Sequence, residues 1–157
     1  MSSTIRKFSY LMVSCSFVAT AAYAVDGMIT VKSAGNVEQT TQRLESVLRE
    51  KGAVVVATVD HAAAATKVGM KLRPTRVVIF GNPKAGTPLM QCTQTMGIDL
   101  PQKALIWEDD KGQTWIAYND VKYLAKRHDI GNCGGAVESN AKALQGIVSQ
   151  AASGATQ

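Results

Sequence analysis

The residues best suited to bind a small molecule lie in a turn between a predicted strand, 76–80, and a following helix. They are Gly81, Asn82, Lys84, Gly86 and Thr87. Glycine, asparagine and proline predict a tight turn, and Pro88 suits the first position of a helix. The first N–H groups of a helix lack partners within it, and its dipole favours negative charge there. The sequence therefore predicts a site for a small anionic or polar ligand.

The glycine spacing of this turn is close to that of a phosphate-binding loop, but the lysine of such a loop is missing. That lysine stands between the second glycine and the threonine, whereas here Thr87 follows Gly86 directly. Lys84 lies inside the turn instead. We therefore do not expect nucleotide hydrolysis. A purely structural turn is the other interpretation, because turn formation alone selects glycine, asparagine and proline.

Two histidines and one asparagine are further candidates for the ligand site. His61 follows Asp60 at the start of an alanine-rich helix, where it could act in acid–base chemistry or bind the ligand. His128 lies on the apolar stripe of a later helix, near its C-terminus, so packing and capping are alternative roles. Asn119 ends a predicted strand and could form a polar wall with His61. A metal-assisted enzyme using His61 is therefore an alternative to a binding protein.

Sulfur atoms offer a second kind of metal chemistry. Cys92 and Met96 lie one helical turn apart and Met90 is near them, a set that could hold Cu(I). Core packing explains the methionines equally well, and a disulfide at Cys92 would remove its thiolate. The sequence contains no Gly-x-Ser-x-Gly, His-Glu-x-x-His or Cys-x-x-Cys motif. We therefore expect no metal and no cofactor, and we assign no catalytic residue.

The first 24 residues have the pattern of a cleaved signal peptide. A basic pair precedes an apolar stretch, and an Ala-x-Ala pattern ends at Ala24. We expect cleavage between Ala24 and Val25, which would place the mature protein in the periplasm or outside the cell. A lipoprotein anchored at Cys15 fits less well, because only about six apolar residues precede that cysteine. The apolar stretch is too short to span a bilayer, so we expect no stable membrane anchoring after processing.

Cleavage would leave 133 of the 157 residues, which is enough for one domain with a substantial core. We expect this single domain at 25–153 and a frayed tail at 154–157. Loss of two basic residues with the leader lowers the formal net charge from +5 to +3. A charge this small indicates neither nucleic acid nor an anionic membrane surface as a partner.

Two cysteines, Cys92 and Cys133, remain after cleavage of the leader. An even number of cysteines in an oxidising compartment favours a disulfide. Closing a loop of about forty residues would stabilise the protein by roughly 3–4 kcal/mol. Two separate buried thiols are the alternative, because the sequence does not give the distance between them.

The hydrophobic periodicity predicts strands alternating with helices. We expect strands at 27–33, 53–59, 76–80, 102–108 and 113–119, and helices at 37–51, 62–68, 88–96, 121–128 and 137–151. The last two strands form a hairpin around a tight turn. This order indicates a two-layer α+β domain, in which a mixed sheet of about five strands carries the helices. An edge or face of that sheet left open would suit a structural homodimer, which is our second functional hypothesis.

A series of short motifs resembles the bacterial family catalogued as domain of unknown function 302. The motifs are Asp60-His61-Ala62, Leu72-Arg73-Pro74-Thr75, Phe80-Gly81-Asn82-Pro83, Gly86-Thr87-Pro88-Leu89-Met90, Asp99-Leu100-Pro101, Trp107-Glu108-Asp109, Tyr118-Asn119, Tyr123-Leu124-Ala125 and Arg127-His128. The resemblance covers roughly residues 27–130, and the ordered set is more specific than any single motif. It implies a compact α+β fold, sometimes exported, and no established activity. Cys133 lies outside the family pattern, so its bond to Cys92 would be a local adaptation to export.

Overall fold

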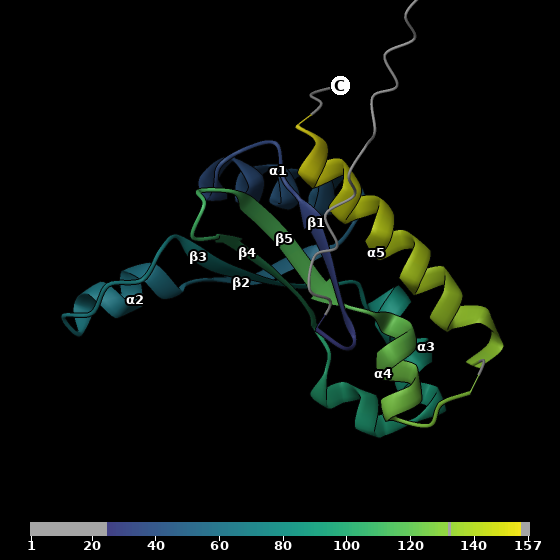
Figure 1. The fold of residues 1–157 in the computed structure, drawn as a ribbon. Coiled ribbons are helices and arrows are strands. Elements are labelled where there is room, and N and C mark those ends of the chain that lie inside the picture. Colours follow the sequence, from purple (N-terminus) through teal and green to yellow (C-terminus); the bar gives the residue numbers. More distant parts are fainter. Residues whose placement is uncertain (1–24, 132, 155–157) are drawn as a thin grey trace, which may run out of the picture.

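The computed structural model describes residues 25–131 and 133–154, and its centre is one five-stranded sheet (Figure 1). The strands are β1 (Met28–Lys32), β2 (Val54–Asp60), β3 (Thr75–Gly81), β4 (Gln102–Glu108) and β5 (Thr114–Asn119). Their order across the sheet is β1-β5-β4-β3-β2, and every neighbouring pair is antiparallel. The predicted α+β class is confirmed, whereas the prediction of a mixed sheet is wrong.

The sheet is fully antiparallel because the chain reverses direction between neighbouring strands. β2 leads through α2 (His61–Lys67) back into β3, so that Asp60 lies opposite Arg76. β1 takes the far edge beside β5, with Met28 opposite Asn119. A mixed sheet would require at least one crossover connection between parallel neighbours, and the described strands contain none.

The other helices are α1 (Val37–Glu50), α3 (Pro83–Cys92), α4 (Val121–Arg127) and α5 (Ala136–Ser153). Two short 3-10 segments, η1 (Gln94–Ile98) and η2 (Cys133–Gly135), follow α3 and precede α5. α1 begins with the predicted capping box. The Oδ1 atom of Asn36 accepts from the N–H of Gln39 at 2.9 Å, and the Oε1 atom of Gln39 accepts from the N–H of Asn36 at 3.1 Å. Two helix-start N–H groups are thereby satisfied.

The hydrophobic core lies between one face of the sheet and the pair of helices α1 and α5, which are in contact with each other (Figure 1). Alternate residues of each strand point into it, as the pleat of a strand requires. Its buried members include Val78, Phe80, Ala104, Ile106, Ile116 and Tyr118 from the sheet, and Leu44, Leu48, Leu144 and Val148 from the helices. The side chains on the opposite face of the sheet, such as Leu105 and Trp107, are only half-buried.

α3 begins earlier than the sequence pattern indicates. The predicted helix 88–96 is wrong at both ends, because α3 runs from Pro83 to Cys92 and Met96 lies in η1. Pro83 occupies the first helical position, the place that the sequence pattern gives to Pro88. Asn82 is the N-cap residue, and its side chain accepts a hydrogen bond from the first turn.

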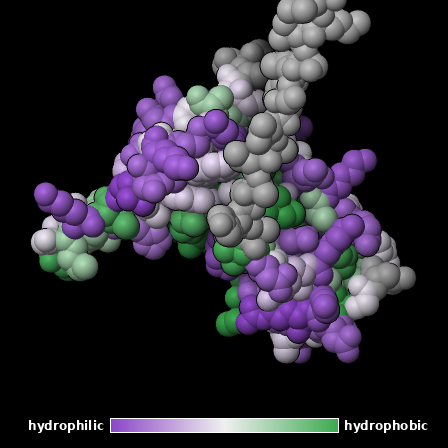
Figure 2. Space-filling view, in the orientation of Figure 1, coloured by the Kyte–Doolittle hydropathy of each residue, from purple (hydrophilic) through white to green (hydrophobic). Residues whose placement is uncertain are grey.

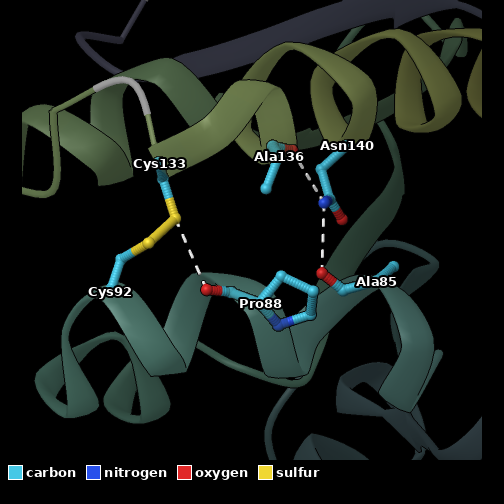
Figure 3. The surroundings of a disulfide bond; sticks show 6 residues. All are labelled: Ala85, Pro88, Cys92, Cys133, Ala136 and Asn140. Carbon is cyan, nitrogen blue, oxygen red and sulfur yellow. Dashed lines mark hydrogen bonds between the residues drawn. A yellow bond between two sulfur atoms is a disulfide. The ribbon is translucent and has the colours of Figure 1, made fainter.

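Cys92 and Cys133 form the predicted disulfide, with their Cα atoms 6.0 Å apart. The bond ties the end of α3 to η2, directly before α5 (Figure 3). The Sγ atom of Cys133 also lies 3.4 Å from the carbonyl oxygen of Pro88. Because Cys92 is bonded, the Cu(I) alternative loses its thiolate, and Met96 is buried in the core.

The predictions for the chain termini fall largely outside the described residues. These are the signal peptide at 1–24, its cleavage between Ala24 and Val25, lipidation at Cys15, and the tail at 155–157. Gly154 is described, and it ends α5 in the left-handed conformation with a φ of 69°. Within the described part of the chain, no helix is long and apolar enough to cross a membrane.

Candidate functional site

A groove of about 620 Å³ lies between α5, the end of β3 and the start of α3. Phe80, Leu144 and Ile147 make its floor apolar. Gly81 and Asn82 form part of its wall, so the groove lies beside the turn indicated by the sequence. Its volume falls within the range of about 300–1,000 Å³ that is usual for small-molecule sites.

The first turn of α3 does not offer free N–H groups to this groove. The Oδ1 atom of Asn82 accepts from the N–H of Lys84, and the carbonyl oxygen of Asn82 accepts from the N–H groups of Ala85 and Gly86, each at 2.9 Å. The Nδ2 atom of Asn82 also donates to the carbonyl oxygen of Gly52 at 3.2 Å. The predicted cluster of bare amides is therefore wrong, because asparagine before proline caps the helix from within the chain.

Two of the predicted ligand residues, Gly81 and Asn82, line the groove. Lys84 and Thr87 are exposed on α3, and Gly86 lies inside that helix; none of the three is part of the lining. Asn119 ends β5, opposite β1 at the edge of the sheet. Of the predicted ligand residues, only Gly81 and Asn82 therefore lie at the groove.

The two histidines lie on different elements, and neither lines the groove. His61 is exposed at the start of α2. His128 follows α4, with its Nε2 atom 2.6 Å from Oδ2 of Asp99 and its Nδ1 atom 3.0 Å from Oγ1 of Thr95. This network joins α4 to η1. Within residues 25–131 and 133–154, there is no group of three or more His, Cys, Asp or Glu side chains that could bind a metal ion.

The polar rim of the groove is positively charged. Lys51, just after α1, and Lys142, on α5, are both exposed lining residues. Among the residues that the structure describes, no aspartate or glutamate belongs to the lining. Positive charge above an apolar floor favours a ligand with a negative group and an apolar part.

Side-chain amides also line the groove, among them Asn140 and Gln102. The Nδ2 atom of Asn140, on α5, donates to the carbonyl oxygens of Ala85 at 3.1 Å and Ala136 at 2.9 Å, which joins α5 to α3 (Figure 3). The Oε1 atom of Gln102, at the start of β4, is buried and accepts no hydrogen bond from the described residues. Such an unpartnered acceptor costs about 1–3 kcal/mol. Removal of this oxygen should therefore relieve a cost within the folded protein.

Gly146 lies inside α5 and lines the groove, and a Cβ added there would meet no atom within 4 Å. Glycine in a helix interior is less favourable than alanine by about 1 kcal/mol. No close neighbour requires glycine at this position. The consequence of its missing side chain is a more open groove.

The sequence of residues 29–151 matches the family described as "Domain of unknown function DUF302". The chain belongs to the DUF302 family. This confirms the family resemblance seen in the motifs. The matched residues include Cys133, so the expectation that Cys133 lies outside the region of the family is wrong. A solved structure agrees with it: the "uncharacterized conserved protein DUF302 from Bacillus stearothermophilus" superposes with a TM-score of 0.74. The superposition covers 81% of this chain and 99% of that one at 18% identity, so it supports the fold alone.

Curated relatives of this DUF302 chain include two proteins named "Fluoride-specific ion channel FluC 1". The relative from Brucella suis biovar 1 (strain 1330) is 45% identical over 105 residues, which are 67% of this chain and 41% of the relative. The relative from Brucella abortus biovar 1 (strain 9-941) gives the same identity and length, with 39% of the relative covered. The chain therefore spans about two fifths of the length of these relatives.

Apart from Gly81 and Asn82, the lining residues of this DUF302 protein escape prediction from its sequence, among them Lys51, Gln102, Asn140, Lys142 and Gly146. Lys51 and Gln102 are distant in the sequence from the lining residues of α5, and they meet them only because α5 packs beside α1, α3 and the sheet. Gly146 carries the one local signal, since a glycine inside an amphipathic helical pattern calls for an explanation. No pattern in the sequence distinguishes the other residues from ordinary surface residues.

A second hollow, of about 450 Å³, lies at the base of α2. Arg76 forms ion pairs there with Asp60 and Glu38. The pKa of Asp60 is below its ordinary value, chiefly because the backbone N–H of Ala63 donates to its carboxylate, with Arg76 adding to the effect. Because the arginine is already paired, the groove beside α5 is the better candidate for a ligand site.

Proposed function

We propose that this DUF302 chain is an exported domain that binds a small ligand in the groove beside α5. The observation that supports this is the composition of the lining, which combines an apolar floor, two lysines and no carboxylate. Export is supported by the signal-peptide pattern at 1–24.

The names of the curated relatives fit an anion as the ligand. These proteins are named for fluoride, and the matched segment makes up about two fifths of each. Fluoride should therefore be among the anions tested on this chain, together with organic anions. The two lysines of the groove supply the charge that any such ligand would need.

A ligand screen by thermal unfolding tests the proposal. A compound present at 100 times its Kd should stabilise the protein by about 2.7 kcal/mol. In Gly146→Leu, the new side chain should project into the groove and remove this stabilisation. Gly146→Ala is the matched control, since it makes the same change in helix propensity and adds only one methyl group. A shift that survives unchanged in Gly146→Leu would place the ligand elsewhere.

A structural homodimer is the second candidate function, and a protruding segment supports it. α2 and the adjoining ends of β2 and β3 protrude from the rest of the molecule (Figure 1). No side chain of α2 is buried. Figure 2 shows apolar residues on this segment, where Val68, Met70 and Leu72 are 71%, 66% and 50% exposed. A seven-residue helix without a buried side chain is marginal in water, so a covering partner would stabilise it.

The open face of the sheet is a second apolar surface. Val77, Ile79, Leu105, Trp107 and Trp115 point to that face and are half-buried in the single chain. Light scattering tests the dimer: the wild type should have twice the monomer mass, and Leu72→Asp should lower it. Ile98→Asp is the control, because Ile98 is 74% exposed on η1, away from this surface. A wild-type monomer at high concentration would exclude the dimer.

A further inference from the structure

We infer that the ligand of the groove is an elongated organic anion with one carboxylate and an unbranched apolar chain. This inference rests on the proposed function and specifies the chemistry of its ligand. Three features of the lining carry it: the length of the groove along α5, the apolar floor, and the sign of the charge at the rim.

The groove is long in one direction. Its lining residues on α5 extend from Ser139 to Gln150, which corresponds to about 16 Å along a helix with a rise of 1.5 Å per residue. Gly146 lies within this stretch, and its missing side chain leaves open space above the helix. A compact inorganic ion would occupy only a small part of such a groove, whereas an extended chain would follow it.

The floor of the groove favours contact with apolar groups of a ligand. Phe80 and Leu144 are buried core residues whose surfaces close the bottom, and Ile147 is half-buried beside them. Burial of each additional CH₂ group should strengthen binding about fourfold. Affinity should therefore increase with chain length until the groove is filled.

The positive charge at the rim of the groove favours a ligand with a negatively charged group. Lys51 and Lys142 approach the groove from different elements, and no carboxylate among the lining residues opposes them. A single carboxylate on the ligand can interact with either ammonium group while its chain lies on the floor. A neutral amide of the same length would keep the apolar contact and lose this attraction.

The test is a titration series by calorimetry with butyrate, hexanoate and octanoate, and with octanamide, fluoride and inorganic phosphate as comparison compounds. The Kd should decrease about fourfold per CH₂ from butyrate to octanoate. Octanamide should bind at least tenfold more weakly than octanoate. Gly146→Leu should weaken octanoate binding at least tenfold, and Gly146→Ala should leave it nearly unchanged.

Charge variants show whether the groove is the binding site. Lys51→Glu and Lys142→Glu should each weaken octanoate binding severalfold. Lys111→Glu, in the exposed hairpin turn, makes the same charge change away from the groove and should have no effect. Equal losses in all three variants would indicate a general charge effect and would overturn the inference.

The remaining outcomes separate this inference from the proposed function. One outcome is that fluoride or phosphate binds to the wild type and loses this binding in Gly146→Leu, while octanoate does not bind at all. In that case the groove is a ligand site and the inference on chain length is wrong. If octanoate binds equally well to Gly146→Leu, it binds elsewhere, and the inference is also wrong. If no compound binds to the wild type, both the inference and the proposed function fail.

Discussion

The Nε2 atom of His128 lies 2.6 Å from the Oδ2 atom of Asp99, and this contact joins the end of α4 to the segment after η1. Both side chains are well covered, with exposed fractions of 7% and 12%. The Nδ1 atom of His128 is 3.0 Å from Oγ1 of Thr95, so both ring nitrogens are engaged. Buried polar groups that lose a partner cost more than exposed ones.

His128→Ala should therefore destabilise the protein by about 1–3 kcal/mol, measured by urea unfolding. The loss arises because Asp99 and Thr95 each lose a partner, although Arg127 still contacts Oδ1 of Asp99. His61→Ala is the matched control, since His61 is exposed, and it should change stability by less than about 0.5 kcal/mol. Equal effects of the two substitutions would contradict a structural role for the His128 network.

Gln102→Met should stabilise the ligand-free protein by about 1 kcal/mol. The substitution keeps a similar volume and removes the buried Oε1 atom that accepts no hydrogen bond from the described residues. Thermal unfolding in the absence of ligand is the measurement.

The control for this change is Gln113→Met. The Nε2 atom of Gln113 donates to the carbonyl oxygens of Ser33 at 3.0 Å and Thr114 at 2.8 Å. Its removal should lower stability by about 1–3 kcal/mol, opposite in sign to Gln102→Met. If both substitutions destabilise alike, Gln102 has a structural partner, and the account of its Oε1 atom as an unpartnered acceptor is wrong.

Loss of the disulfide should lower stability by about 3–4 kcal/mol in the chain-entropy account, because the bond closes a loop with a sequence separation of 41. The double variant Cys92→Ser/Cys133→Ser, compared with the oxidised wild type by urea unfolding, measures this loss. The wild type in an excess of dithiol reductant should match the double variant. If the reduced wild type retained full stability, the entropic account of this bond would be wrong.

The sequence predicted the local elements of this fold well. The capping box of Asn36 and Gln39 and the hairpin of β4 and β5 follow from residues close together in the chain. The disulfide was inferred from the count of cysteines and the expected compartment. Strand direction was missed, because the pairing of β1 with β5 is decided by long-range packing rather than by either strand's sequence.

The candidate site was only partly predictable, for a related reason. The turn at Gly81 and Asn82 has a strong local pattern, and the structure does place it beside a groove. The chemistry of that groove comes instead from Lys51, just after α1, Gln102 in β4 and Lys142 in α5. No local pattern in these segments reveals that they share a site.

Asp109 should give the protein a measurable dependence of stability on acid. The pKa of Asp109 is below its ordinary value of 3.8, first because the indole N–H of Trp115 donates to it at 2.8 Å, and then because the backbone N–H of Gln113 does so. A carboxyl group whose pKa is lower in the folded state stabilises that state above the unfolded-state pKa. This stabilisation is fully present at neutral pH and is lost as the pH falls below 3.8 through the folded-state value.

Asp109→Asn removes the charge and keeps the shape of the turn. Its free energy of unfolding should be lower than that of the wild type at pH 7, and the two should converge as the pH falls below 3.8. Asp110→Asn, in the same turn, is the control and should follow the wild type at every pH, because Asp110 is exposed. Urea unfolding from pH 7 to pH 2.5 measures the three curves. A constant gap between Asp109→Asn and the wild type across this range would show that the hydrogen bonds of Asp109 contribute independently of its charge.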